Sequence, residues 1–256
     1  MARSARELVT TSRLGKKSKA PVWKLLNAVG YDLTRLQVSD EEHTRSLVRR
    51  MAIAQLLDVG ANQGQYASSF RNRTGFTGNI VSLEPTSEAF KRLSARARPD
   101  TSWRTVHAAA GAEVGSLEIS VAANSVSSSL LAVSGEHLRH EPGSRTKAKE
   151  TVRVDRLDNL LESSERRRRS WLKLDVQGYE SQVLLGAPET LKLVYVVQAE
   201  ISFQHLYSGQ TDYLELLGIL EDRGFVPVKI IPGFSDPVTG DLLQCDVVAM
   251  RSEPDQ

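Results

Sequence analysis

The sequence predicts an α/β fold built on a mainly parallel β-sheet that ends in an antiparallel hairpin. From residue 53 onward, short apolar runs typical of buried strands alternate with helical segments. The expected strands cover residues 55–59, 79–84, 103–109, 170–175 and 194–200, with helices over residues 65–71, 87–98 and 179–186. Near the end, a helix over 213–223 precedes strands at 225–231 and 246–250, separated by prolines and glycines. That spacing favours a hairpin over another crossover.

Charge divides the 256 residues into two segments. Residues 1–50 contain 11 Lys and Arg and 5 Asp and Glu, a net charge of +6, whereas the whole chain carries +2. Residues 51–256 therefore carry the difference, −4. We expect residues 1–50 to be a basic N-terminal extension with short helices near 22–29 and 39–50, and residues 51–256 to form the main domain.

A Ser-rich insertion around residues 111–169 interrupts the alternation of strands and helices. It contains two expected strands, 117–121 and 152–154, and a short helix over 157–161. Residues 124–149 between them are rich in serine, glycine and charge, and they are too many for a simple connector. This stretch is therefore either a lid that faces a substrate or a disordered segment.

Cysteine usage and hydropathy indicate a cytoplasmic protein. Cys245 is the only cysteine, so neither an intramolecular disulfide nor a cysteine metal cage can form. The N-terminus lacks the apolar run of a signal peptide, and no stretch reaches the ~20 apolar residues of a membrane-spanning helix. The helix near 22–29 is expected to cap the core, with peripheral membrane contact as the alternative.

A glycine loop follows the first predicted strand. The segment Asp58-Val59-Gly60-Ala61-Asn62-Gln63-Gly64 joins that strand to a helix and would place backbone N–H groups beside a ligand. It differs from the dinucleotide pattern Gly-x-Gly-x-x-Gly and lacks the Gly-Lys-Ser/Thr ending of a phosphate-binding loop. A plain turn is the competing interpretation. The loop favours a ligand that carries a nucleoside without a polyphosphate.

Glu84 supports the nucleoside interpretation. It ends the second predicted strand, about twenty residues beyond the glycine loop. In nucleoside-binding α/β folds an acid at this position accepts hydrogen bonds from the ribose hydroxyls. A carboxylate at a strand end is otherwise usually solvated, so the offset from the loop is what makes Glu84 a candidate binding residue.

Several further motifs resemble the FkbM family of S-adenosylmethionine-dependent O-methyltransferases. The match includes the glycine loop, Leu83-Glu84-Pro85, Ser127-Ser128-Ser129-Leu130 and, most specifically, Leu172-Lys173-Leu174-Asp175-Val176-Gln177-Gly178-Tyr179-Glu180. It covers roughly residues 53–250 and implies a Rossmann-like class I methyltransferase sheet. The chain is also similar to actinobacterial members that methylate sugar hydroxyls on glycolipids. Many relatives have Glu where this chain has Gln177.

The resemblance implies that S-adenosylmethionine is the methyl donor. Asp58 would lie near its methionine amino group, Glu84 would bind its ribose, and Ala109 would lie near its adenine. Plain core packing is the alternative for Ala109. The full set of residues expected at the donor is Asp58, Gly60, Ala61, Asn62, Gly64, Tyr66, Glu84, Pro85 and Ala109.

The acceptor side is expected at the ends of the fourth and fifth strands. Asp175, Glu200 and His205 form a candidate acid/base cluster, with Asp175 or His205 as the base. The same three side chains could bind Mg²⁺, but they are too few to name a metal. The residues expected to contact the acceptor are Ser128, Ser129, Gln177 and Tyr179.

These inferences leave several functions open. The leading one is O-methylation of a carbohydrate hydroxyl, on a small molecule or a glycolipid. The alternatives are a polyketide-type or other small natural product as acceptor, and a non-catalytic methyltransferase-like binding protein. Nucleic acid is not expected as a partner, because residues 51–256 are net acidic and the aromatic content of 6% offers no stacking platform. A homodimer remains possible.

Overall fold

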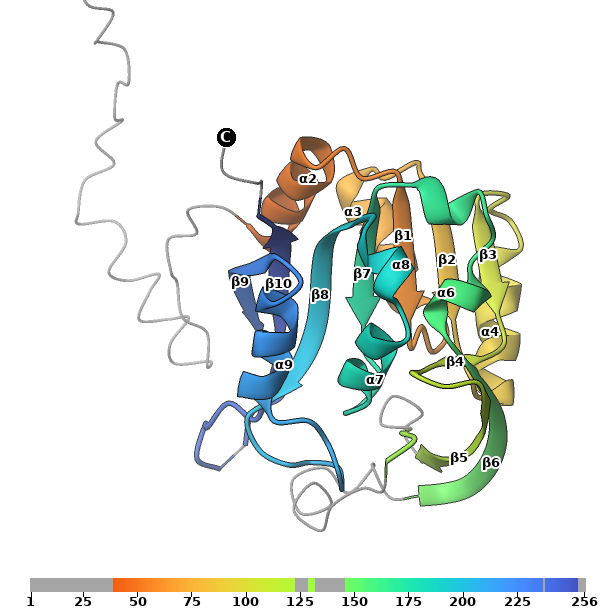
Figure 1. The fold of residues 1–256 in the computed structure, drawn as a ribbon, viewed down its shortest axis with the longest axis vertical. Helices are drawn as coiled ribbons and strands as arrows, with labels where there is room; N and C mark the ends of the chain where they lie inside the picture. The colour runs from red at the N-terminus through yellow and green to blue at the C-terminus, as the bar shows by residue number, and fades with distance from the viewer. Residues whose placement is uncertain (1–38, 123–128, 132–145, 237, 253–256) are drawn as a thin grey trace, which may run out of the picture. The chain divides into compact units, whose positions relative to one another are not determined.

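The computed structural model describes residues 39–122, 129–131, 146–236 and 238–252 (Figure 1). The helix expected near 22–29 and the candidate residue Ser128 lie outside these ranges. The chain separates into two compact units, residues 1–39 and 40–256, and the second contains the helices and strands given below. This unit begins upstream of the boundary expected at residue 51, because helix α2 (Asp40–Arg50) buries Leu47 in the same core as the sheet.

A seven-stranded sheet forms the centre of this unit. Its strand order is β3-β2-β1-β7-β8-β10-β9, and β10 runs antiparallel to both of its neighbours while the other pairs are parallel. This confirms the predicted α/β fold, mainly parallel with an antiparallel C-terminal hairpin. The strands are β1 (Gln55–Val59), β2 (Asn79–Leu83), β3 (Trp103–Val106), β7 (Ser170–Leu174), β8 (Val194–Ser202), β9 (Phe225–Pro232) and β10 (Gln244–Arg251).

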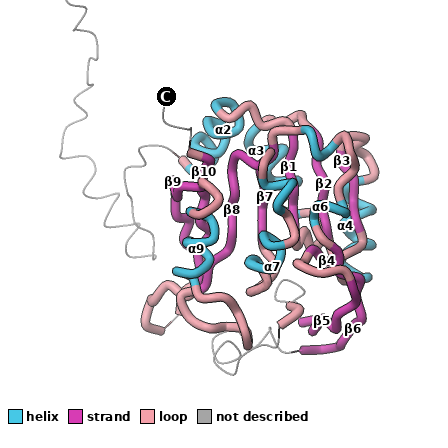
Figure 2. The backbone as a smooth tube through the Cα atoms, viewed as in Figure 1, coloured by secondary structure: helices cyan, strands magenta, loops and turns pink. Residues whose placement is uncertain are grey.

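Helices cover both faces of the sheet (Figures 1 and 2). On one face lie α2, α3 (Gln65–Thr74) and α4 (Ser87–Ala97). The other face carries α6 (Leu157–Leu160), α7 (Glu180–Leu185), α8 (Pro188–Leu191) and α9 (Tyr213–Glu221). This double cover explains why the central strands β1 and β7 are buried at every position and are apolar at most of them.

Two hydrophobic clusters fill the layers between sheet and helices. The cluster under α2 and α3 centres on Trp171, which is fully buried and meets the Phe70 ring at a centroid distance of 5.3 Å. The cluster on the opposite face contains Leu184, Leu191 and Leu220 from the covering helices. Packing on both sides fixes the strands in register and so fixes the residues that follow their carboxyl ends.

The strand expected over residues 103–109 is wrong, because its last part belongs to a second, three-stranded sheet. That strand ends at Val106, and Ala109–Ala110 form a separate strand, β4, which pairs with β6 instead of continuing beside β2. The second sheet has the order β4-β6-β5, with β5 at Gly115–Ala122 and β6 at Thr146–Asp155. Figure 1 shows β5 and β6 beyond the carboxyl ends of the parallel strands.

The length of β6 also exceeds the prediction. Only residues 152–154 were expected, because they alternate apolar and charged side chains, but the strand begins at Thr146. Its first four residues are exposed, with Lys147 and Lys149 among them. A strand pairing on an exposed surface needs no apolar face there, so its sequence carries no alternation signal.

Across the described ranges, no helix has the length and apolar character needed to cross a membrane.

Candidate active site

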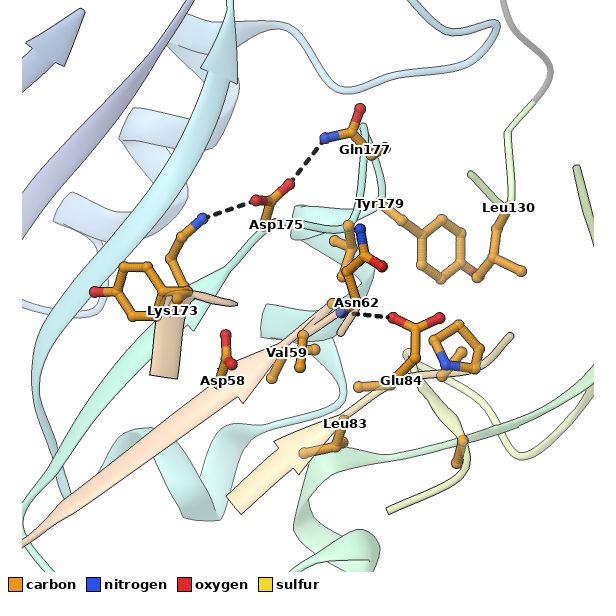
Figure 3. A pocket seen from close by; sticks show the side chains of 18 of the residues that line it. Asp58, Val59, Asn62, Leu83, Glu84, Leu130, Lys173, Asp175, Gln177 and Tyr179 are labelled. Atoms are coloured by element: carbon orange, nitrogen blue, oxygen red, sulfur yellow. Dashed lines mark hydrogen bonds and ion pairs between the residues drawn. The ribbon is translucent and has the colours of Figure 1, made fainter. Parts of the chain in front are cut away.

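A cavity of about 230 Å³ lies at the carboxyl ends of β1, β2 and β7 (Figure 3). Its walls come from the glycine loop after β1, from the residues that follow β2 and β7, and from the second sheet. Ligands of open α/β sheets bind at this edge, where the loops diverge. In Figure 3, Glu84 and Asn62 lie on one side of the cavity, and Lys173 and Asp175 lie on the other.

Gly60 lets the end of β1 approach the end of β7. Its φ angle is 81°, and a Cβ atom on this residue would lie 1.8 Å from the carbonyl oxygen of Asp175. A side chain therefore cannot be placed here without moving the backbone that carries Asp175. Gly64, at φ 78°, begins α3 and faces Leu93 and Trp103 instead of the cavity. Gly64 is thus required for packing, and it does not line the candidate donor site.

Glu84 is fixed by three hydrogen bonds. Its Oε2 atom accepts from the backbone N–H of Asn62 at 2.8 Å, and its Oε1 atom accepts from the backbone N–H and hydroxyl of Thr86 at 2.9 and 2.6 Å. Burial raises the pKa of Glu84, and these three donors oppose that shift. A carboxylate offers about four lone-pair directions, so one remains for a hydroxyl from the cavity.

Asn62 supplies a further polar group to this wall. Its backbone is in the left-handed region at φ 48°, and its side chain lines the cavity. Both its Nδ2 and its Oδ1 atoms are buried without a hydrogen-bond partner among the described residues. Buried amide groups are rarely left unpaired, so this pair of atoms indicates a polar ligand.

Asp58 and Lys173 stand opposite each other on neighbouring strands. They are register partners of β1 and β7, and both line the cavity. Asp58 is 1% exposed and accepts a hydrogen bond from Ser82 at 3.3 Å. Burial raises the pKa of Asp58 to about 7, and the nearby Lys173 ammonium counteracts this rise. This carboxyl group therefore changes charge near neutral pH.

Asp175 is held by a donor on each oxygen. Lys173 Nζ lies 3.2 Å from Asp175 Oδ2, and Gln177 Nε2 donates to Asp175 Oδ1 at 2.8 Å. The side chain remains 39% exposed, so it can still meet a molecule in the cavity. Lys173 is itself buried, yet the surrounding carboxylates, Asp175 first, outweigh its burial and raise its pKa. Lys173 therefore stays charged and presents a fixed cation to Asp175.

The loop after Asp175 has an unusual backbone that Glu180 stabilises. Gln177 and Gly178 both have positive φ angles, 54° and 95°. The Oε1 atom of Glu180 accepts from the backbone N–H groups of Val176 and Gly178 at 3.1 and 3.3 Å. Burial raises the pKa of Glu180 to about 7. The spacing Lys-x-Asp-x-x-Gly-x-Glu thus encodes a cation, a carboxylate, a left-handed turn and the acceptor that caps it.

Gln177 joins Asp175 to a second carboxylate, Glu200. Its Nε2 atom donates to Glu200 Oε2 at 2.9 Å as well as to Asp175, and its Oε1 atom accepts from the Tyr207 hydroxyl. Gln244 also donates to Glu200 Oε2, at 3.0 Å. Burial and the charge of Asp175 hold the pKa of Glu200 well above its usual range. An amide can bridge two carboxyl groups in this way, whereas a Glu at position 177 would add a third.

Most of the candidate residues from the sequence meet at the cavity, and four described ones do not. Gly64 packs behind it, and Glu200 lies behind Gln177. Ser129 is buried and donates to the Gln177 carbonyl at 2.7 Å, so it supports the loop from outside. His205 is exposed and does not line the cavity. The candidates that do line it are Asp58, Gly60, Ala61, Asn62, Tyr66, Glu84, Pro85, Ala109, Asp175, Gln177 and Tyr179.

The described residues contain no group of three or more His, Cys, Asp or Glu side chains arranged to hold a metal ion. The expected cluster of Asp175, Glu200 and His205 is therefore not assembled as a metal site in this structure. Asp175 and Glu200 are joined through an amide donor, and that donor occupies the position between them.

Comparison with known proteins now decides the family. The methyltransferase FkbM domain matches residues 58–227, which include the glycine loop, Glu84 and the whole segment from Lys173 to Glu180. The chain belongs to the FkbM methyltransferase family. No curated protein matches this chain.

Solved structures with a similar fold are distant in sequence. An FkbM methyltransferase from Methylobacillus flagellatus KT is similar over 76% of this chain and 43% of its own, with 15% identity and a TM-score of 0.47. This chain thus spans less than half of that protein. An S-adenosylmethionine-dependent methyltransferase from Aquifex aeolicus is similar over 91% and 98% of the two chains, at 13% identity and a TM-score of 0.41.

Three residues contribute to the site although the sequence did not predict a role for them. Lys173 lies within the family match without an expected role, although a lysine between apolar residues in Trp171-Leu172-Lys173-Leu174 is itself a signal, because lysine is rarely buried without a partner. Ile119 and Leu130, from the insertion, also line the cavity. Ile119 lies in an expected strand and Leu130 in a segment of the family match, but neither pattern indicates which apolar side chain faces a ligand.

The raised pKa of Asp58 predicts a pH-dependent effect on stability. Between about pH 4, its ordinary range, and pH 7, the folded methyltransferase binds more protons at this site than the unfolded chain. Asp58 therefore lowers stability progressively as the pH rises through this interval. We expect Asp58→Asn to gain stability relative to the wild type over the same interval, as measured by urea denaturation at a series of pH values. The exposed Asp222→Asn is the control, and a gain at Asp58 that did not vary with pH would contradict the assignment.

Proposed function

We propose that this methyltransferase binds S-adenosylmethionine in the cavity and transfers its methyl group to a hydroxyl of a carbohydrate, with a glycolipid sugar as the favoured acceptor class. The observation that carries the proposal is the placement of two carboxylates, Glu84 and Asp175, at opposite sides of one cavity and on either side of the glycine loop. One suits the ribose of a nucleoside, and the other suits an acceptor hydroxyl.

The donor side fits a nucleoside with an amino-acid tail. Glu84 retains a lone pair for a ribose hydroxyl, and the unpartnered amide of Asn62 can pair with polar groups of the same ligand. Pro85 and Ala109 line the cavity beside Glu84 and offer an apolar surface to an adenine ring. When bound, S-adenosylmethionine supplies a methyl group already activated on a sulfonium.

The acceptor side requires a group that takes a proton. A hydroxyl becomes a stronger nucleophile as its proton is removed, and a carboxylate within hydrogen-bond distance can accept that proton. Asp175 is partly exposed to the cavity, and Lys173 and Gln177 fix its orientation. Gln177 and Tyr179 line the same part of the cavity and are the proposed acceptor contacts. Because residue 177 is a glutamine in this chain, its uncharged amide cannot take the role that a carboxylate would have at this position.

Apolar residues in the cavity wall favour a second class of acceptor, a natural product with an apolar surface. Ile119 and Leu130 line the cavity from the insertion side. A polyketide-type or other small natural product with a hydroxyl group would also bury apolar surface there. A screen that compares methyl transfer to sugars with transfer to such natural products distinguishes the two acceptor classes.

Glu84→Ala should weaken donor binding. Losing the hydrogen bonds of a charged acceptor to the ribose costs about 1.5–3 kcal/mol, or roughly 10- to 100-fold in Kd. The measurement is calorimetric titration with S-adenosylmethionine and S-adenosylhomocysteine. The control is Glu88→Ala on α4, whose side chain is 73% exposed and should leave Kd unchanged. Equal affinities for both variants and the wild type would exclude Glu84 from the donor site. A folded wild type that bound neither ligand would favour the non-catalytic binding protein.

Asp175→Asn should lower turnover about 10²- to 10⁴-fold, the usual contribution of a general base, with little change in donor affinity. The assay measures transfer of labelled methyl to the acceptor found by screening sugars, glycolipids and polyketide-type hydroxyl compounds. His205→Ala is the companion variant, because the sequence alone left either residue as the base. Loss of turnover only in His205→Ala would move the base to the exposed loop, and near-normal turnover in both variants would refute general-base catalysis by either.

A further inference from the structure

Lys173 is a buried cation that faces the candidate donor cavity. Among the described residues it is the one Lys or Arg side chain in the cavity wall. It lies on β7 directly opposite Asp58 of β1, so the two side chains project from the same face of the sheet. In Figure 3 both lie at the end of the cavity away from Glu84.

The two opposite charges do not pair with each other. The ion pairs that Lys173 forms within the described residues run to Asp175 at 3.2 Å and to Asp246 at 3.8 Å, and not to Asp58. Within the described part of the chain, Asp58 accepts one hydrogen bond, from Ser82 at 3.3 Å. A buried carboxylate normally has more donors than this, so Asp58 keeps lone pairs for a ligand. The Lys173 ammonium donates to Asp175 Oδ2 at 3.2 Å and to the Leu174 carbonyl at 3.5 Å, which leaves one of its three N–H groups for a ligand.

The surroundings of Lys173 fix the position of its ammonium. Asp175 and Asp246 lie on two sides, and the Tyr66 ring centroid lies 5.5 Å from Nζ. Tyr66 is held in turn by a hydrogen bond to Gln198 at 2.6 Å, and Gln198 donates to Asp246 at 2.6 Å. This closed network holds the cation at the cavity wall and prevents it from turning toward solvent.

The family resemblance already implies that Asp58 lies near the ammonium of the methyl donor. We propose that Lys173 completes the binding of this α-amino-acid end by donating to the donor's carboxylate. The proposal rests on the proposed function, since it assumes that S-adenosylmethionine is the donor. A zwitterion requires one group of each charge a short distance apart, and a register pair on adjacent strands provides that spacing. Glu84 at the other end would then bind the ribose, so the ligand spans the glycine loop.

Calorimetry with matched ligands tests the proposal without an acceptor. The probes are S-adenosylmethionine, its decarboxylated analogue, which keeps the ammonium and the sulfonium, and 5′-methylthioadenosine, which lacks the amino-acid end. The wild type should prefer S-adenosylmethionine to the decarboxylated analogue by about 10- to 100-fold, as expected for one charge-assisted hydrogen bond. In Lys173→Met this preference should fall to roughly threefold or less, while 5′-methylthioadenosine binds as it does to the wild type.

Asp58→Asn should show the complementary pattern. It should weaken S-adenosylmethionine and the decarboxylated analogue by similar factors and leave 5′-methylthioadenosine unchanged. Lys173→Met leaves Asp246 without its cation, so the double variant Lys173→Met/Asp246→Asn is measured in parallel. The double variant should also lose the preference for S-adenosylmethionine over the decarboxylated analogue. Each preference is the ratio of two Kd values measured on the same variant. A substitution that weakens the binding of all ligands equally therefore leaves the ratio unchanged.

The outcomes separate this inference from the proposed function. A preference that persists in a folded Lys173 variant, or an equal loss of affinity for all three probes, overturns the role of Lys173 and leaves S-adenosylmethionine binding intact. A wild type that binds 5′-methylthioadenosine as well as S-adenosylmethionine overturns the amino-acid subsite alone. A wild type that binds none of the probes overturns the proposed function and this inference with it.

Discussion

The close approach of β1 and β7 at Gly60 is the constraint on which the rest of the site depends. The carbonyl oxygen of Asp175 occupies the position where any side chain on residue 60 would begin, and the backbone N–H of Asp175 donates to Val59 at 3.0 Å. This contact brings the two strand ends together and makes Asp58 and Lys173 register partners. It also aims the loops after both strands into one cavity. A larger residue at position 60 would separate the donor side from the acceptor side.

Charge balance is the second constraint. The buried ammonium of Lys173 is surrounded by four carboxyl groups, those of Asp58, Asp175, Glu200 and Asp246. Burying this many acids is costly, and the structure responds in different ways at each. Asp175 receives the ammonium and an amide, Glu200 receives two amide donors and a raised pKa, and Asp58 receives only a weak donor and a pKa of about 7. The group with the fewest partners is the one that faces the cavity at the proposed donor end.

The sequence predicted the sheet well because most positions of its buried strands are apolar, as in Gln55–Val59 and Ser170–Leu174. It failed where pairing does not depend on burial, as in the exposed start of β6 and the separate strand β4. Position along the sheet edge predicted which carboxylates would share a cavity, so Asp58, Glu84 and Asp175 meet there. The sequence could not reveal that His205 lies on an exposed loop segment, or that Gln177 bridges Asp175 and Glu200. Those contacts depend on side chains from elements far apart in the chain.

In the proposed complex, one cavity holds the donor with its ribose at Glu84 and its amino-acid end at Asp58 and Lys173. A crystal structure of the protein with S-adenosylhomocysteine tests it most directly. We expect the ribose hydroxyls against the Glu84 carboxylate, the adenine beside Pro85 and Ala109, and the sulfur directed toward Asp175. A ligand bound in the reverse orientation, or in a different part of the molecule, would contradict it.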